Sequence, residues 1–197
     1  MSFKRIAIFC GSMTGNEPVF ANQARALVAQ LAKHNIGVVY GGGRIGLMGV
    51  VADAALDAGL EVVGVIPHAL MQKELGHGGC TQLHVVDTMH QRKALMSELA
   101  DGFIALPGGF GTADEMFEIL TWAQLGMHQK PCALLNVQGY FDGLLRWLDE
   151  AVARDFLRPL HRELLLCHDD PIHLLAVMQR AAVHIPPALA TPAPDIR

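Results

Sequence analysis

The sequence lacks several features that mark specialised classes of protein. It has no excess of positive charge, because 15 Lys and Arg residues face 19 Asp and Glu residues and the net charge is -4. Proteins that bind nucleic acid usually carry a basic face, so we expect no nucleic-acid partner. No segment approaches the roughly eighteen uninterrupted apolar residues of a membrane span, and the N-terminal apolar run is too short for a signal peptide. We therefore expect no membrane partner and no export.

Cysteine is scarce and scattered. The four cysteines show no Cys-x-x-Cys spacing, so the sequence predicts neither a disulfide framework nor a zinc ribbon. His77 and His84 lie near Cys80, but this loose group lacks a fourth ligand and paired spacing, so we expect no metal. Buried, reduced thiols fit a cytoplasmic protein, and that is the location we predict.

What the sequence does have is a regular alternation of short β-branched runs with longer helical patterns. This alternation predicts an α/β fold, a single-domain Rossmann-like doubly wound parallel sheet with helices on both faces. This one domain would span residues 1–184, and the Pro- and Ala-rich residues 185–197 would form a disordered tail. The predicted strands are 5–9, 37–40, 62–66, 83–86, 103–106 and 132–136, and the predicted helices are 18–33, 47–58, 89–99, 113–126, 141–154 and 171–181.

Three glycine-rich loops follow predicted strands. They read CGSMTG from Cys10, GGGRIGLMG from Gly41 and PGGFGT from Pro107. Ligands of such sheets bind beyond the carboxyl ends of the strands, where glycine lets the backbone approach a phosphate closely. Any one loop could be an ordinary turn, but the three together favour a phosphorylated ligand. Residues 75–80 could form a further loop over this site.

Two familiar nucleotide motifs fit poorly. Gly41, Gly43 and Gly46 satisfy G-x-G-x-x-G, yet they follow the second strand, and Glu61 begins the third strand instead of ending the second. The P-loop pattern ending in Gly-Lys-Ser/Thr is absent. These mismatches argue against an NAD site and an ATPase.

The segment PGGFGTADE ends on Glu115 in what would be the first turn of a helix. One interpretation has Glu115 pointing back toward a bound anion. The alternative is a capping box, in which Thr112 caps the helix and Glu115 accepts from its backbone N–H. The pattern alone does not separate the two.

The segment TMHQRKALM places Arg92 and Lys93 in the first turns of a helix that Thr88 and Gln91 could cap. Two cations there oppose the helix dipole, so they need an anionic partner, either an acidic side chain or a ligand. A solvated basic face is the alternative.

These segments together with TWAQLG from Thr121 resemble the Lonely Guy family of cytokinin-activating phosphoribohydrolases, over about residues 4–180. The resemblance implies a Rossmann-like fold, a homodimer, no metal or other cofactor, and release of the free base from (N6-modified) adenosine 5′-monophosphate with ribose 5-phosphate. Met13, Phe20 and Arg44 depart from the family's usual residues. The family has often been labelled lysine decarboxylase, but of the five lysines only Lys93 lies in a motif, and no pyridoxal phosphate pocket surrounds it.

In the family the arginine and the closing glutamate of these motifs are catalytic, which implies that Arg92 and Glu115 act here. Glu115 would stabilise an oxocarbenium-like state or activate water, and Arg92 would orient the substrate. Asp114 and Glu118 could instead complement the helix dipole or lie on a solvated face. The predicted substrate contacts in these loops and motifs are Ser12, Gly42, Gly43, Glu74, Met89, Lys93, Gly108, Gly109, Phe110, Gly111, Thr112, Asp114 and Thr121.

Two further hypotheses stay open. The same fold without turnover would be a nucleotide-binding or cofactor-carrier protein. Apolar helical residues beyond what one sheet face needs favour a homodimer, although packing within a monomer is the alternative. These residues are Met48, Val51, Leu95, Met96, Leu99, Trp122 and Leu125.

Overall fold

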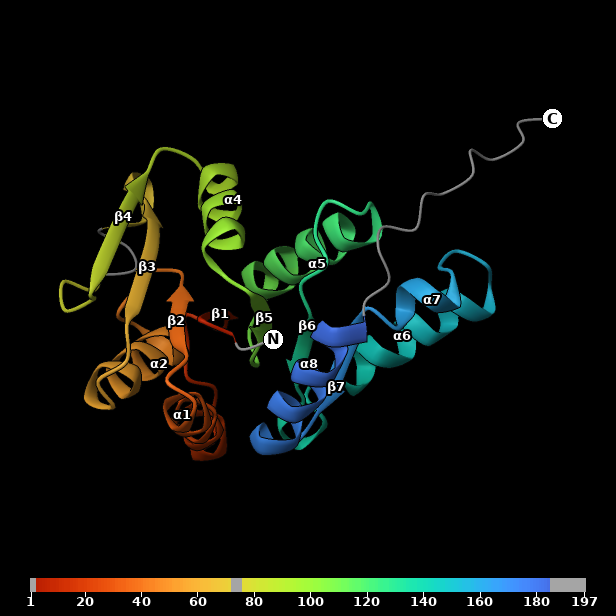
Figure 1. The fold of residues 1–197 in the computed structure, drawn as a ribbon, viewed down its shortest axis with the longest axis horizontal. Helices are drawn as coiled ribbons and strands as arrows, with labels where there is room; N and C mark the ends of the chain where they lie inside the picture. The colour runs from red at the N-terminus through yellow and green to blue at the C-terminus, as the bar shows by residue number, and fades with distance from the viewer. Residues whose placement is uncertain (1–2, 72–75, 185–197) are drawn as a thin grey trace.

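The computed structural model describes residues 3–71 and 76–184, and it contains one seven-stranded parallel sheet (Figure 1). The strand order is β4-β3-β2-β1-β5-β6-β7. Strands β1 to β4 are added toward one edge of the sheet, and strands β5 to β7 are added toward the other. The order of addition therefore reverses between β1 and β5, and this is the switch point at which such sheets bind ligands. The strands are β1 (Arg5–Phe9), β2 (Gly37–Tyr40), β3 (Val62–Pro67), β4 (Gln82–Val86), β5 (Gly102–Ala105), β6 (Cys132–Leu135) and β7 (Leu165–His168).

Helices cover both faces of the sheet, as the sequence predicted. One face packs on α1, α2 and α8, and the other packs on α4, α5 and α6. Successive strand residues point to opposite faces, so Ile6 and Ile8 enter the first core while Ala7 and Phe9 enter the second. The helices are α1 (Pro18–Lys33), α2 (Gly46–Asp57), α3 (His68–Met71), α4 (Met89–Leu99), α5 (Phe110–Gln124), α6 (Asp142–Ala153), α7 (Pro159–Arg162) and α8 (Pro171–His184), with a 3-10 turn, η1 (Val137–Gly139).

Most predicted elements agree with the structure to within one or two residues, and three differences matter. Helix α5 begins at Phe110 rather than at residue 113. Strand β7 at the sheet edge and the short helix α7 were not predicted. The expected tail at 185–197 and residues 72–75 lie outside the described residues.

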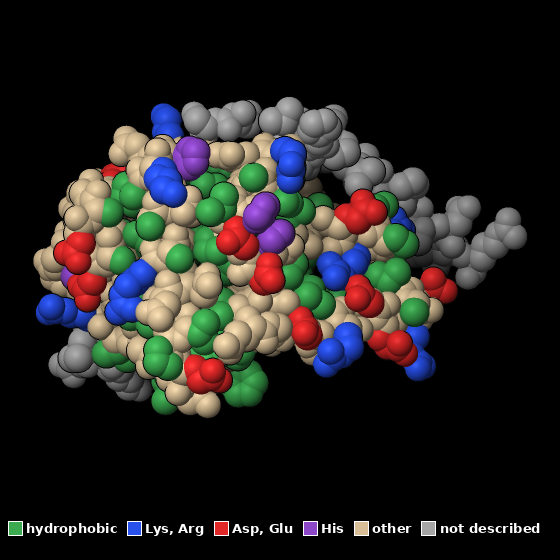
Figure 2. Space-filling view, turned by 90° about the horizontal axis from the view of Figure 1, so that it is seen from below, with side chains coloured by type: hydrophobic (Ala, Val, Ile, Leu, Met, Phe, Trp, Pro, Cys, Tyr) green, Lys and Arg blue, Asp and Glu red, His purple; other side chains and the backbone are tan. Residues whose placement is uncertain are grey.

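The structure agrees with two expectations from the composition, one about surface charge and one about membrane-spanning helices. On the face shown in Figure 2, basic and acidic side chains are intermixed rather than gathered by sign. Within residues 3–71 and 76–184, no helix has both the length and the apolar character needed to cross a membrane.

The loop after β1 is tied to both neighbouring loops by backbone hydrogen bonds. The Gly11 N–H donates to the Pro107 carbonyl at 3.1 Å, and the Leu47 N–H donates to the Gly11 carbonyl at 3.0 Å. Gly46 lets the chain enter α2 at this crowded point, because its φ is +61° and a Cβ there would lie 2.2 Å from the carbonyl carbon of Ser12. Only glycine meets both requirements.

We therefore expect Gly46→Ala to destabilise the protein by about 3 kcal/mol or more, since it adds a backbone clash to the cost of a left-handed conformation. Gly59→Ala is the matched control, because Gly59 has a φ of +74° but nothing within 4 Å of the added Cβ. That change should cost only about 1 kcal/mol. If urea unfolding shows that the two variants lose the same free energy of unfolding, this account of the loop is contradicted.

Candidate active site

The three glycine-rich loops lie side by side at the carboxyl ends of β2, β1 and β5, as the strand order requires. Beside them is a hollow of about 880 Å³ that is open to solvent. Its walls are residues 11–16, Leu47 at the start of α2, residues 107–109, Phe20 and Tyr140. Of the predicted contacts, Ser12, Gly108 and Gly109 line this hollow, and so do Met13 and Phe20, which depart from the family pattern.

The N-terminus of α5 faces the same loops without a side-chain cap. Gly109 is the N-cap residue and provides no side-chain hydrogen bond. The capping-box alternative is therefore wrong: Thr112 is the third residue of the helix, and Glu115 lies in its second turn. The helix therefore begins about one turn earlier than the pattern suggested. Just before it, the backbone of Gly108 lies so close to Thr112 that an added Cβ would stand 2.1 Å from the Thr112 hydroxyl oxygen. The uncapped N–H groups suit an anionic ligand group.

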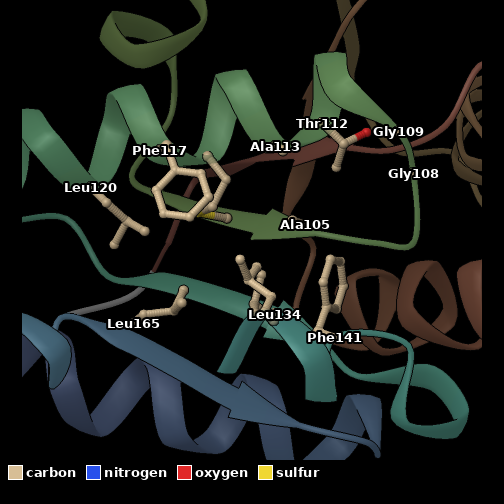
Figure 3. A pocket seen from close by; sticks show the side chains of 12 residues that line it. Ala105, Gly108, Gly109, Thr112, Ala113, Phe117, Leu120, Leu134, Phe141 and Leu165 are labelled. Atoms are coloured by element: carbon tan, nitrogen blue, oxygen red, sulfur yellow. The ribbon is translucent and has the colours of Figure 1, made fainter. Parts of the chain in front are cut away.

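Residues 110–115 of α5 differ in exposure. Phe110 is 96% exposed at the first helical position, and Gly111 is exposed beside it. Thr112 is buried. Figure 3 shows the Thr112 hydroxyl turned toward the Gly108–Gly109 loop, at one end of an apolar cavity of about 340 Å³ beneath α5. Phe117 and Leu120 line the deeper part of that cavity, which offers no polar partner for a phosphate.

Arg92 of α4 and Glu115 of α5 meet in a buried ion pair. Their side chains are 7% and 8% exposed, and Arg92 Nη2 lies 3.6 Å from Glu115 Oε1. Nη2 also donates to the Gly41 carbonyl at 3.2 Å. A Cβ at position 41 would lie 1.9 Å from Nη2, so glycine is required there for the guanidinium to approach. The two residues that the motifs assigned to catalysis are thus in contact.

The Arg92 guanidinium keeps one buried donor without a partner. Its Nε has no hydrogen-bond partner among the described residues. Its Nη1 lies 3.8 Å from the sulfur of Met89, which is a weak acceptor. A buried donor of this kind is normally satisfied in a protein, so its position suits a ligand oxygen.

The first turn of α4 is organised as the sequence predicted. Thr88 and Gln91 form a capping box, in which the Gln91 N–H donates to Thr88 Oγ1 at 3.1 Å and the Thr88 N–H donates to Gln91 Oε1 at 3.3 Å. The cap fixes the start of the helix and hence the direction in which Arg92 points.

Lys93 also finds acidic partners. Its Nζ lies 3.0 Å from Asp114 Oδ2 and 2.9 Å from Glu118 Oε2. Burial lowers the pKa of Lys93, but the contacts with Glu118 and Asp114 outweigh it and the pKa is raised. The amine is therefore held protonated, whereas a Schiff-base lysine needs a neutral amine. Asp114 and Glu118 bind this lysine rather than merely complementing the dipole or facing solvent.

Cys10 lies beside the Arg92–Glu115 pair at the end of β1. Burial and the negative charge of Glu115 raise the pKa of its thiol, and the Arg92 charge only partly offsets them. The thiol stays neutral near pH 7 and forms an uncharged surface beside the ion pair.

Other predicted contacts lie apart from this pair. The Gly42 carbonyl accepts from the His77 N–H at 2.8 Å, and Gly43 pairs with Gly76, so this part of the second loop holds the segment at 76–80. Thr121 lies about 13 Å along α5 from Thr112, at about 1.5 Å per residue, and its hydroxyl donates to the Phe117 carbonyl. Glu74 lies outside the described residues.

The histidines and cysteine near residue 80 have separate partners. His77 Nε2 lies 2.9 Å from Asp53 Oδ1, and the Cys80 sulfur lies 3.2 Å from the Tyr40 hydroxyl. Within the described part of the chain, no group of three or more His, Cys, Asp or Glu side chains could hold a metal ion.

Tyr140 is a site residue that the sequence analysis missed. Its hydroxyl donates to the Gly108 carbonyl at 2.6 Å, and its ring lines the hollow edge-on to Phe20. The turn that presents it needs left-handed backbone at Gln138 and Gly139. Tyr140 follows β6, which lies beside β5, and the carboxyl ends of neighbouring parallel strands meet at the same edge of the sheet. This position could have indicated that Tyr140 lies near the loop after β5.

Solved structures with the same fold include cofactor-binding proteins. The molybdenum cofactor carrier protein from Chlamydomonas reinhardtii matches with a TM-score of 0.68 and 20% identity, covering 91% of this chain and 98% of that one. The molybdenum cofactor binding protein from Rippkaea orientalis matches with a TM-score of 0.67 and 20% identity, over 91% and 98% of the two chains. At this identity the likeness establishes the fold alone.

Sequence relatives are much more similar. The cytokinin riboside 5′-monophosphate phosphoribohydrolase of Rhodococcoides fascians is 49% identical over 168 residues, which cover 84% of this chain and 85% of that one. The Arabidopsis thaliana enzyme of the same name, LOG1, is 48% identical over 164 residues, which cover 83% and 77% of the two chains. A family profile described as "possible lysine decarboxylase" matches residues 48–178. The chain therefore belongs to the family that this profile describes, which is the Lonely Guy family that the motifs indicated.

Proposed function

We propose that the protein is an N-glycosyl hydrolase that releases the free base and ribose 5-phosphate from adenosine 5′-monophosphate or its N6-modified forms. The observation that carries this proposal is the buried Arg92–Glu115 pair beside three glycine-rich loops. It is supported by relatives at 44–49% identity that are named phosphoribohydrolases. The raised pKa of Lys93 argues against a Schiff-base decarboxylase.

The mechanism follows from the charges at the site. Water adds its oxygen to C1′ of the ribose, the bond from C1′ to the base breaks, and the base leaves with a proton. The sugar becomes oxocarbenium-like on the way, so a carboxylate at Glu115 stabilises it or orients the attacking water. Arg92 orients the substrate through its unpartnered Nε, and the neutral Cys10 thiol adds no competing charge.

The 5′-phosphate provides binding energy at a distance from the reacting bond. The uncapped N-terminus of α5 and the hollow beside it are the proposed phosphate site, with Ser12, Gly108–Thr112 and Tyr140 around it. Such remote binding energy helps to align the ribose with Glu115.

We also propose a cytoplasmic homodimer. All four cysteines are free thiols, as a reducing compartment requires. Of the apolar residues proposed for the interface, Met48, Val51 and Met96 are buried within one chain. Leu125 is 67% exposed at the end of α5, and Met127 beside it is 66% exposed, so these two are the better candidates for contact with a second copy.

The phosphate site predicts that adenosine is a far poorer substrate than AMP. We expect kcat/KM to fall by about a hundredfold or more, with a loss in kcat as well as in affinity. Ribose 5-phosphate should compete with AMP, and ribose should not. Equal kcat/KM for the nucleoside and the nucleotide in a chromatographic assay of free adenine would contradict the proposal.

Glu115→Gln tests the carboxylate, because it preserves size and removes the charge. We expect turnover to fall by about a hundredfold or more while AMP still binds. The loss of the buried ion pair should cost about 3–5 kcal/mol of stability, so melting temperature and AMP affinity must be measured beside base release. The control is Glu98→Gln, an exposed position on α4, which should leave all three unchanged. Wild-type turnover by Glu115→Gln would remove Glu115 from the mechanism.

The dimer is tested by light scattering at micromolar concentration. We expect a mass of about twice the 21.3 kDa of one chain. Replacing Leu125 and Met127 by Glu should give the mass of one chain, since two charges would enter an apolar contact. Phe156→Glu, at an 86% exposed position, is the control and should remain dimeric. A wild-type mass near 21 kDa would decide against the dimer.

A further inference from the structure

Each member of the Arg92–Glu115 pair has a charged neighbour in the chain, and those neighbours also meet. Lys93 follows Arg92 on α4, and Asp114 precedes Glu115 on α5. Lys93 Nζ lies 3.0 Å from Asp114 and 2.9 Å from Glu118, one helical turn further along α5. Two ion-pair contacts therefore join the same two helices beside the reacting pair.

The lysine is well enclosed for a surface cation. Its side chain is 13% exposed, and Glu118 is 22% exposed, whereas Asp114 is 57% exposed. The ammonium group donates a hydrogen bond to Asp114 Oδ2, and its 2.9 Å contact with Glu118 Oε2 is an ion pair without hydrogen-bond geometry. The raised pKa of Lys93 shows that the carboxylates outweigh the cost of burial. The charge of the ammonium group is therefore balanced by two carboxylates of the protein itself.

The helices that carry Arg92 and Glu115 come from different parts of the chain, and both pack on one face of the sheet, where they share β1 as a neighbour. Side-chain contacts between the two helices adjust how their facing residues meet. At 3.6 Å, the Arg92–Glu115 pair is longer than a hydrogen bond and does not fix this arrangement tightly. The Lys93 contacts are shorter and bridge α4 to two successive turns of α5. They hold the Lys93 ammonium group of α4 against one face of α5.

We propose that Lys93, Asp114 and Glu118 form a positioning cluster that sets the distance between Arg92 and Glu115, and that Lys93 is not a substrate contact. The inference rests on the proposed hydrolase function. It replaces the role that the family motif suggested for Lys93, and it gives Glu118 a function.

The test compares removal of the lysine with removal of its partners. The variants are Lys93→Met, the double variant Asp114→Asn with Glu118→Gln, the triple variant that combines them, and Lys93→Arg. For each, kcat and KM for AMP, the dissociation constant of AMP and the melting temperature are measured.

A positioning role predicts that Lys93→Met and the double variant each lower kcat by about tenfold or more, because small misplacements of reacting groups are costly. The dissociation constant of AMP should stay within about twofold. The triple variant should be no worse than Lys93→Met, since residues of one cluster do not act additively. Lys93→Arg should recover most of kcat, because its guanidinium reaches both carboxylates.

Other outcomes overturn the proposal. A direct substrate contact would weaken AMP binding in Lys93→Met and leave the double variant unaffected. A purely structural role would lower the melting temperature with kcat unchanged. If Lys93→Met does not fold, the double variant alone decides by the same criteria.

Failure of the proposed function is distinguishable from failure of the cluster. A wild-type protein that releases no base from AMP would contradict the hydrolase and leave the cluster to be judged by stability. Lys93→Met and Glu115→Gln should then be coupled in their effects on the free energy of unfolding. Additive effects would overturn the cluster.

Discussion

The site depends on a buried arginine meeting a buried glutamate between two helices on one face of the sheet. Neither Arg92 nor Glu115 is stable there alone, because an unpaired charge in a protein interior is costly. Their contact requires a capped start for α4, a glycine at position 41 and an early start for α5. The fold thus holds both proposed catalytic side chains on helices rather than on loops.

The surrounding loops separate two tasks. Backbone groups at the uncapped start of α5 and the hollow beside it suit an anion, and side chains of α4 and α5 suit the reacting bond. The apolar cavity beneath α5 is lined by Gly108, Gly109 and Thr112 next to the proposed phosphate site, and by Phe117 and Leu120 further along the helix. In the hydrolase that we propose, such a division would let a phosphate far from the bond align the substrate with Glu115.

Much of this was predictable from the sequence, since β-branched strands buried on both faces and glycine loops after them have strong local signals. The charge pattern of TMHQRK predicted an anionic partner, either an acidic side chain or a ligand, and Glu115, Asp114 and Glu118 are acidic partners of this kind. The start of α5 was not predictable, because Thr112-x-x-Glu115 satisfies a capping box while contacts with Gly108 decide the outcome. Tyr140 was missed because its role depends on a carbonyl 32 residues away. Strand β7 pairs with β6 alone, contains no β-branched residue and has only Leu165 fully buried, so its sequence pattern is weak.

The most direct test of the central claim follows the oxygen of the attacking water. The purified protein is incubated with AMP in water enriched in oxygen-18, and the products are separated and weighed by mass spectrometry. Our account predicts equal amounts of free adenine and ribose 5-phosphate, with one labelled oxygen in the sugar phosphate, measured before the sugar exchanges its anomeric oxygen with water. Recovery of bound AMP intact, with no adenine released, would contradict it.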